Sequence, residues 1–263
     1  MSDKTEYAPG TFCWADAGTT DVDAAKRFYG EVLGWSFHDS PMGEGQFYSH
    51  AQIRGKDVAA LYEQKAEMRA MGMPPFWLLY ISVKSVEEVT SRVEKLGGKV
   101  MMPPFDVMDA GRMAIIGDPT GAGVALWEPK RHPGSTVVDE PGTACWHELV
   151  TNDTVKAAAF FTELLGWEAA EQEMGPMKYT LFKSGGQPIG GMMAIGPEMG
   201  PMPPAWLIYF AVDDCDAAVH RAMRGGGKML MPAMDIPTVG RIATLQDPQG
   251  AVFAIGKLEA PAS

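Results

Sequence analysis

Residues 9–35 read PGTFCWADAGTTDVDAAKRFYGEVLGW, and residues 141–167 read PGTACWHELVTNDTVKAAAFFTELLGW. The two stretches align without a gap, and 13 of their 27 positions are identical. A repeat of this length indicates that the chain contains two copies of one structural unit. Each unit occupies about half of the 263 residues.

The repeat continues along both halves of the chain. WLLYISV from Trp77 matches WLIYFAV from Trp206, and GRMAIIGDPTGA from Gly111 matches GRIATLQDPQGA from Gly240. Between the halves lies EPKRHPGSTVVDEPG, whose prolines and glycines are typical of a linker.

Within the first half, the pattern predicts two similar modules in succession. Each opens with a short strand, continues with a helix that a glycine ends, and closes with three strands separated by turn residues. Asp21 or Asp23 can cap the first helix, and Ser85 can cap the second, with Glu88 three residues later. The predicted strands are 11–20, 36–40, 45–53, 57–62, 76–83, 99–107, 112–118 and 123–129, with helices over 24–34 and 85–98.

The composition excludes several classes of partner. The formal net charge is -11 and the isoelectric point is about 4.9, which argues against nucleic acid and against anionic membranes. No run of 18 apolar residues occurs, and the N-terminus has no apolar core of a signal peptide, so we expect a cytoplasmic protein. The three cysteines are far apart, and Cys13 and Cys145 are equivalent in the repeat, so we expect core thiols rather than a disulfide. The 19 methionines suit either a methionine-rich core or a methionine-lined pocket.

Four βαβββ modules, FYGEVLGW and FFTELLGW after the first strand of each half, and DPTGA or DPQGA before the last strand resemble the glyoxalase/bleomycin-resistance/extradiol-dioxygenase family, also called the vicinal oxygen chelate superfamily. The chain looks most similar to a paired-domain actinobacterial branch named hydroxylase-like or glyoxalase-like. The resemblance implies an α+β fold in which four βαβββ modules form two tandem half-barrel domains. We expect these domains at 1–130 and 141–263, joined by a linker at 131–140.

The resemblance also implies where a metal would bind. Metal-dependent members ligate it from the inner, concave face of each half-barrel, through the first and last strands of each module. None of the corresponding residues is a metal-ligand type, and a divalent metal needs three or four such ligands. They are Trp14, Ala59–Ala60, Leu78 and Ala125 in the first half, and Trp146, Gly190–Gly191, Leu207 and Ala254 in the second.

We therefore predict no metal and no other cofactor. His147 lies one residue beyond Trp146, so strand alternation turns it to the opposite face, and its counterpart is Ala15. We expect a surface or interface histidine rather than a ligand.

A tryptophan and a carboxylate take the place of the metal ligands. Alternation puts Asp16 on the same strand face as Trp14, and Glu148 on the same face as Trp146. Burial in an apolar concavity would raise the pKa of either carboxylate and suit it to general base catalysis. The alternative is that both carboxylates only form fixed ion pairs, for which the repeated arginines Arg112 and Arg241 are the expected partners. The predicted catalytic residues are Asp16 and Glu148, and the predicted ligand-binding residues are Trp14, Tyr48, Trp77, Arg112, Trp146, Tyr179, Trp206 and Arg241.

The first functional hypothesis is a metal-independent glyoxalase-like protein that acts on, or assists the conversion of, an apolar or aromatic small molecule such as a polyketide or antibiotic. The second is a binding protein that sequesters such a ligand, as bleomycin-resistance relatives do. A metal-dependent glyoxalase or dioxygenase is the third, which the missing ligands disfavour. The expected partner is thus a small molecule, bound by a monomer or homodimer. Tyr80 and Tyr209 are interpreted as barrel core, and the first half is expected to be the roomier because Gly18 stands where the second half has Val150.

Overall fold

The computed structural model describes residues 4–43, 45–138, 140–174 and 177–259, and it contains four βαβββ modules in succession. The first half comprises β1 (Phe12–Thr19), α1 (Val22–Leu33), β2 (Ser36–Gly43), β3 (Gln46–Ile53), β4 (Lys56–Glu63), a short α2 (Ala66–Ala70), β5 (Phe76–Ser82), α3 (Val86–Val93), η1 (Glu94–Leu96), β6 (Lys99–Val107), β7 (Gly111–Gly117) and β8 (Gly123–Pro129). The second half comprises β9 (Ala144–Thr151), α4 (Thr154–Leu165), β10 (Glu168–Met174), β11 (Met177–Ser184), β12 (Gln187–Ala194), η2 (Pro197–Met199), β13 (Ala205–Ala211), α5 (Cys215–Arg224), β14 (Lys228–Ile236), β15 (Gly240–Gln246) and β16 (Val252–Leu258).

The helix ends follow the capping signals in the sequence. The Asp21 side chain accepts a hydrogen bond of 2.9 Å from the Ala24 backbone N–H, which identifies the cap of α1. Gly34 ends α1 in the left-handed region at φ 76°, where only glycine carries no steric cost. Asp153 and Gly166 perform the same functions for α4. The two helices therefore begin and end at equivalent positions of the repeat.

Each half forms one eight-stranded mixed sheet. The strand orders are β2-β3-β4-β1-β5-β8-β7-β6 and β10-β11-β12-β9-β13-β16-β15-β14, so the two sheets have the same topology. The first and last strands of a module pair in parallel, and the first strands of two successive modules pair antiparallel. These tandem half-barrels confirm the predicted α+β fold of four modules.

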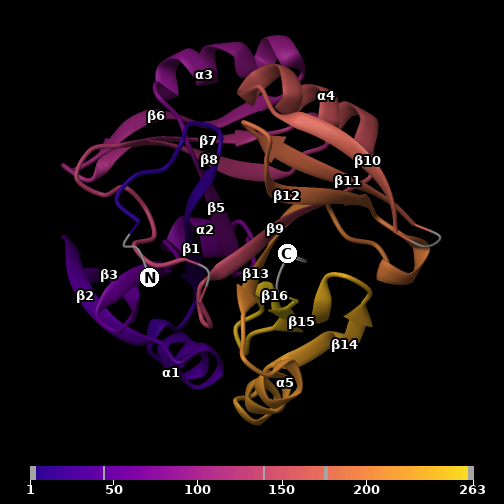
Figure 1. Ribbon diagram of the computed structural model, residues 1–263. Coiled ribbons are helices and arrows are strands. Elements are labelled where there is room, and N and C mark those ends of the chain that lie inside the picture. The colour runs from indigo at the N-terminus through magenta and orange to yellow at the C-terminus, as the bar shows by residue number, and fades with distance from the viewer. Residues whose placement is uncertain (1–3, 44, 139, 175–176, 260–263) are drawn as a thin grey trace.

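The two sheets share one hydrophobic core, which is formed by their helix-bearing faces. Figure 1 shows the helices of the halves in pairs, with α1 beside α5 and α3 beside α4. Indole N–H groups cross between the halves: Trp35 donates to the Gly142 carbonyl at 2.8 Å, and Trp167 donates to the Gly10 carbonyl at 2.7 Å. The opposite, inner face of each sheet therefore points away from the shared core.

No disulfide joins any of the three cysteines, and Cys13 and Cys215 are buried. None of the helices among the described residues has the length and apolar composition that crossing a bilayer requires.

Candidate functional site

The inner face of the first sheet holds a buried carboxylate between two tyrosines. Asp16 is 3% exposed, and its Oδ2 accepts hydrogen bonds from the hydroxyls of Tyr48 and Tyr80, both at 2.8 Å. The Tyr48 hydroxyl in turn accepts the indole N–H of Trp14 at 2.9 Å. These four side chains come from β1, β3 and β5, so the network depends on the register of three strands.

The second sheet repeats this network. Glu148 Oε2 accepts a hydrogen bond of 2.6 Å from the Tyr209 hydroxyl. Trp146 donates its indole N–H to the Tyr179 hydroxyl at 2.8 Å. Tyr179 also contributes a hydrogen bond that favours ionised Glu148. The two inner faces thus carry equivalent tryptophan, tyrosine, carboxylate and tyrosine side chains.

Burial dominates the electrostatics of both carboxylates. Removal from water raises the pKa of Asp16 to about 6, although the hydrogen bonds from Tyr80 and Tyr48 oppose this change. Burial also raises the pKa of Glu148, against the hydrogen bonds from Tyr209 and Tyr179. Within the described residues, Asp16 Oδ1 is buried without a hydrogen-bond partner. A carboxylate with only neutral donors around it can accept a proton at neutral pH, as general base catalysis requires.

The predicted ion pairs with the two repeated arginines are wrong. Arg112 and Arg241 both lie near the surface and bind exposed carboxylates instead. Their partners are Glu87 and Asp106 for Arg112, the latter at 3.0 Å, and Asp216 and Asp235 for Arg241, at 2.9 and 3.0 Å. Neither arginine meets the buried carboxylate of its own half.

Strand alternation explains where these arginines go. In β7, Met113 and Ile115 belong to the apolar cluster of the inner face, whereas Ala114 and Ile116 belong to the shared core. Arg112 has the parity of Ala114, so it lies on the helix-bearing side. Arg241 occupies the same position in β15.

Trp77 and Trp206 also lie on the helix-bearing side, away from the carboxylates. Trp77 donates its indole N–H to the Tyr29 hydroxyl at 3.0 Å, and Trp206 packs edge-on to Phe12 at 5.2 Å between ring centroids. Of the predicted ligand-binding residues, the structure brings Trp14 and Tyr48 to Asp16, and Trp146 and Tyr179 to Glu148.

Tyr80 and Tyr209 are the residues that sequence reasoning missed. Both are buried, as expected of barrel core, but their hydroxyls also donate hydrogen bonds to the two carboxylates. The sequence contained a sign that Tyr80 faces inward. Tyr80 lies two residues after Leu78, on the same face of the strand, and Leu78 occupies a position where metal-dependent relatives carry a ligand.

The positions where a metal would be expected do converge. Trp14, Ala60, Leu78 and Ala125 all belong to the apolar cluster on the first inner face. They offer no nitrogen, oxygen or sulfur ligand to a divalent ion. Across the described ranges, no group of three or more histidine, cysteine, aspartate or glutamate side chains could hold a metal ion. The residues present therefore do not fit the metal site of the fold.

His147 lies between the two halves. Its ring stacks on Phe12 at 4.0 Å with an interplanar angle of 16°, and its Nδ1 lies 3.2 Å from the Ile189 carbonyl oxygen. Burial lowers its pKa to about 4, so the ring is neutral at physiological pH. It faces away from Trp146, as alternation predicts.

The segment that connects the two halves runs across the inner face of the first sheet. The Ser135 backbone N–H donates to the Cys13 carbonyl at 2.8 Å, and the Tyr7 hydroxyl donates to the Ser135 carbonyl at 2.7 Å. Gly134 lies so close that an added Cβ would be 2.3 Å from the Cys13 carbonyl oxygen. The same segment places the His132 ring edge-on to Trp14 at 4.5 Å between ring centroids, so it covers that part of the first inner face.

Equivalent residues on the second inner face remain accessible. Trp14 and Leu78 are buried at 5% and 7% exposure, whereas Trp146 and Leu207 are partly exposed. The structure thus leaves the second inner face the more open one. The expected room at Gly18 is taken by Tyr62, whose hydroxyl would lie 3.0 Å from an added Cβ.

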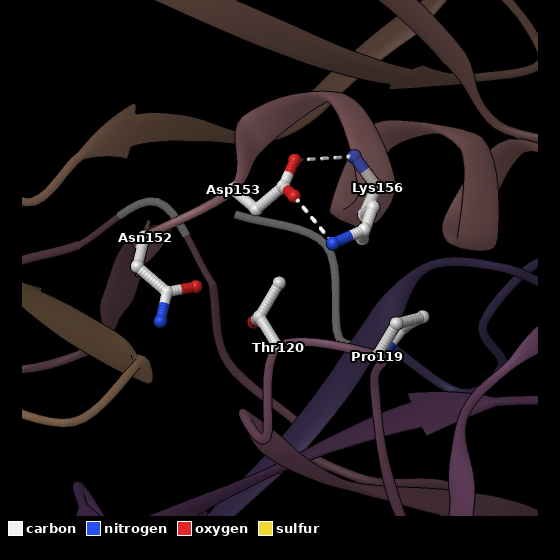
Figure 2. A pocket seen from close by; sticks show the side chains of 5 residues that line it. All are labelled: Pro119, Thr120, Asn152, Asp153 and Lys156. Carbon is white, nitrogen blue, oxygen red and sulfur yellow. Dashed lines mark hydrogen bonds and ion pairs between the residues drawn. The ribbon is translucent and has the colours of Figure 1, made fainter.

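A separate hollow of about 430 Å³ lies between the β7–β8 turn and the start of α4 (Figure 2). Its lining is polar, and its two charged side chains form an ion pair, with Lys156 Nζ 2.9 Å from Asp153 Oδ2. Asp153 Oδ1 also accepts a hydrogen bond from the Lys156 backbone N–H. The hollow contains neither buried carboxylate, so we place the candidate chemistry on the inner faces instead.

Comparison with known proteins agrees with this geometry. The family model described as Glyoxalase/Bleomycin resistance protein/Dioxygenase superfamily matches residues 12–126 and 134–255. The chain is 44% identical to CFP32 of Mycobacterium tuberculosis (strain CDC 1551 / Oshkosh), provisionally named a glyoxylase, over 98% of each chain. It is 36% identical to the anthracycline biosynthesis protein DnrV of Streptomyces peucetius, over 97% of this chain and 95% of that protein.

Solved structures share the fold at low sequence identity. The Mn(II)-bound glyoxalase from Novosphingobium aromaticivorans has a TM-score of 0.65 at 17% identity, over 96% of this chain and 84% of that one. The 2,2',3-trihydroxybiphenyl 1,2-dioxygenase from Sphingomonas wittichii strain RW1 has a TM-score of 0.66 at 13% identity, over 95% and 91%.

Proposed function

The chain belongs to the glyoxalase/bleomycin resistance protein/dioxygenase superfamily, and we propose that it acts on an apolar or aromatic small molecule without a metal, at the inner face of its second half. The observation that carries this proposal is the network around Glu148, in which the carboxylate is buried but two of the neighbouring rings are partly exposed. A carboxylate whose pKa burial raises lies there beside partly exposed Trp146 and Tyr179. Such a group can take a proton from a bound ligand while the rings hold the ligand in place.

The relatives support an aromatic substrate. DnrV is named for anthracycline biosynthesis, and anthracyclines contain fused aromatic rings. The strand surface around Glu148 suits such a ligand, because it offers the rings of Trp146 and Tyr179 together with the side chain of Met193. In this role Glu148 is the general base, and Tyr209 orients its carboxylate through the 2.6 Å hydrogen bond.

The test is Glu148→Gln, which keeps the shape and one acceptor oxygen but removes the basic lone pairs. General base catalysis contributes about 10²–10⁴-fold in rate, so turnover should fall by that order while ligand affinity changes little. Conversion of a panel of hydroxylated naphthoquinones and anthraquinones, followed by mass spectrometry, provides the assay. Asp16→Asn is the matched control, because the covered first network should not affect turnover. Unchanged turnover in Glu148→Gln would remove Glu148 as the base.

A binding protein that sequesters the same kind of ligand is the second candidate. The hydrogen bonds from Tyr209 and Tyr179 favour this candidate, because they already stabilise the Glu148 carboxylate within the protein. That is what a purely structural carboxylate requires. In that case the panel would contain compounds that bind and none that is converted.

Metal independence is part of the proposal and has its own test. Elemental analysis of protein purified without chelators should give no stoichiometric transition metal, and dialysis against a chelator should leave turnover unchanged. A metal at one equivalent, lost together with activity, would favour the metal-dependent class.

A further inference from the structure

We propose that Gly191 is a positioning residue for Glu148, a role that rests on the proposed function of Glu148 as the general base. Gly191 lies directly beside Glu148, because the two residues pair where β12 and β9 run in parallel. Since glycine has no side chain, the Tyr179 hydroxyl can lie against the backbone of β12 and bind the carboxylate from there. The first half of the chain solves the same packing problem with different residues.

The tip of the Tyr179 ring occupies the place of the missing side chain. A Cβ added to Gly191 would lie 1.9 Å from the Tyr179 hydroxyl oxygen and 2.2 Å from Cζ, the ring carbon that carries it. Atoms of two residues do not approach this closely, so a larger residue would displace the ring. From its present position Tyr179 accepts the Trp146 indole N–H at 2.8 Å and hydrogen-bonds to Glu148.

In the first half, the residue that faces the carboxylate is alanine. Asp16 pairs with Ala60 in the parallel ladder of β1 and β4, as Glu148 pairs with Gly191. Ala60 is fully buried, and the Tyr48 hydroxyl reaches Asp16 at 2.8 Å. Aspartate has one methylene fewer than glutamate, and alanine has one methyl group more than glycine. Each pair therefore brings the same number of side-chain carbon atoms to its network.

This exchange matters because both carboxylates are buried, Asp16 at 3% exposure and Glu148 at 8%. In a close-packed interior, an extra methylene needs a matching loss of volume nearby. For Glu148 that loss is at Gly191, where Tyr179 takes the place that the methyl group of Ala60 fills in the first half. Glutamate with glycine and aspartate with alanine are therefore matched pairs.

The position of Tyr179 also affects the proton that Glu148 would accept. Burial raises the pKa of Glu148, and the hydrogen bonds from Tyr209 on β13 and Tyr179 on β11 oppose this change. A substitution of Gly191 that displaces Tyr179 removes one of these two donors, so the pKa of Glu148 should rise further. Gly191 thus acts on the base through Tyr179.

A double-mutant cycle tests the match between Glu148 and Gly191 without any substrate. Glu148→Asp leaves a carboxylate too short for its tyrosines, and Gly191→Ala forces the Tyr179 ring aside. Each single substitution should therefore raise the unfolding equilibrium constant at least about tenfold in denaturant unfolding. The double substitution reproduces the pair of Asp16 and Ala60, so it should be more stable than either single variant.

Gly256→Ala is the matched control, because Gly256 is a buried glycine of the same sheet. The nearest atoms to its added Cβ belong to side chains, at 3.3 Å for Leu258 and 3.4 Å for Ile242. These side chains belong to β15 and β16, outside the network of Glu148. Gly256→Ala should therefore not recover the stability that Glu148→Asp loses.

A pH profile separates a positioning role from a purely structural one. The change in tryptophan fluorescence between about pH 4 and pH 8 that Glu148→Gln abolishes reports the titration of Glu148, because Trp146 belongs to the same network. Gly191→Ala should move the midpoint of this change upward on the order of one pH unit, since it loses the Tyr179 hydrogen bond. Gly256→Ala should leave the midpoint at its wild-type value.

Two results would overturn the proposal. One is a double variant whose loss of stability equals the sum of the two single losses, because Glu148 and Gly191 would then pack independently. The other is a Gly191→Ala variant that unfolds more easily but keeps the wild-type midpoint, because the role of Gly191 would then be structural alone. If Gly191→Ala does not fold, folding of the double variant supports the match and its failure to fold overturns it.

The proposed function can fail separately from this match. Unchanged turnover in Glu148→Gln together with a recovered double variant would remove Glu148 as the base and keep Gly191 as the residue that positions its carboxylate. Lost turnover in Glu148→Gln together with additive losses in the cycle would keep the base and overturn the role of Gly191.

Discussion

The buried carboxylate of Asp16 gives the sharpest stability prediction, because the donors that reach it among the described residues, the hydroxyls of Tyr48 and Tyr80, are neutral. Burial raises its pKa from an ordinary 3.8 to about 6. At about 1.4 kcal/mol per pH unit, ionising this group in the folded chain costs about 3 kcal/mol more than in the unfolded chain. Asp16→Asn removes that cost and leaves one oxygen to accept both tyrosine hydroxyls. The amide nitrogen takes the place of Oδ1, which itself is buried without a hydrogen-bond partner among the described residues.

The direction in which stability changes with pH depends on whether the folded or the unfolded chain binds the Asp16 proton more tightly. Between about pH 4 and pH 6 the folded chain keeps the proton and the unfolded chain loses it, so the stability contribution of protonated Asp16 falls as pH rises. It is fully present below about pH 4 and lost above about pH 6. Asp16→Asn should therefore match the wild type near pH 4 and exceed its unfolding free energy by up to about 3 kcal/mol at pH 7.5. For a chain of this size the gain corresponds to roughly 5–10 °C in melting temperature.

The assay is denaturant unfolding of both proteins from pH 4 to pH 8, with the difference between them plotted against pH. Asp39→Asn is the matched control, because the Lys26 hydrogen bond lowers the pKa of Asp39, and its removal should slightly destabilise the chain at neutral pH. A difference between Asp16→Asn and wild type that does not grow with pH would refute the reasoning. So would a loss of stability at pH 7.5, which would indicate that ionised Asp16 has a charged partner.

Two further substitutions test how the halves are built. Gly191→Ala would put a Cβ 1.9 Å from the Tyr179 hydroxyl oxygen, so it should cost about 1–3 kcal/mol in chemical unfolding and displace that tyrosine from its network. Gly256→Ala serves as its control and should change the unfolding free energy by less than about 1 kcal/mol, since only side chains are near; equal costs for both would contradict the packing argument. Trp35→Phe removes the indole N–H that binds the Gly142 carbonyl at 2.8 Å, so thermal unfolding should show a loss of about 1–3 kcal/mol. An unchanged melting temperature would mean that this hydrogen bond between the halves contributes nothing.

Local patterns in the sequence determined the modules and the direction of several side chains. Capping aspartates and glycines set the helix ends, and alternation along a short strand put Asp16 beside Trp14 and turned His147 away. These features depend on residues a few positions apart, so they are readable without knowing what packs against them. The same alternation, applied to β5 and β7, would also have placed Tyr80 inward and Arg112 outward.

The tertiary structure alone decided which partners the carboxylates have and which half is open. The contacts of Asp16 with Tyr48 and Tyr80 depend on pairing between strands that lie far apart in the sequence. The path of the segment 130–138 across the first inner face depends on backbone contacts with Cys13, which no local pattern encodes. Long-range register and chain path therefore separate a filled inner face from an accessible one, because burial is a property of the neighbours and not of the strand itself.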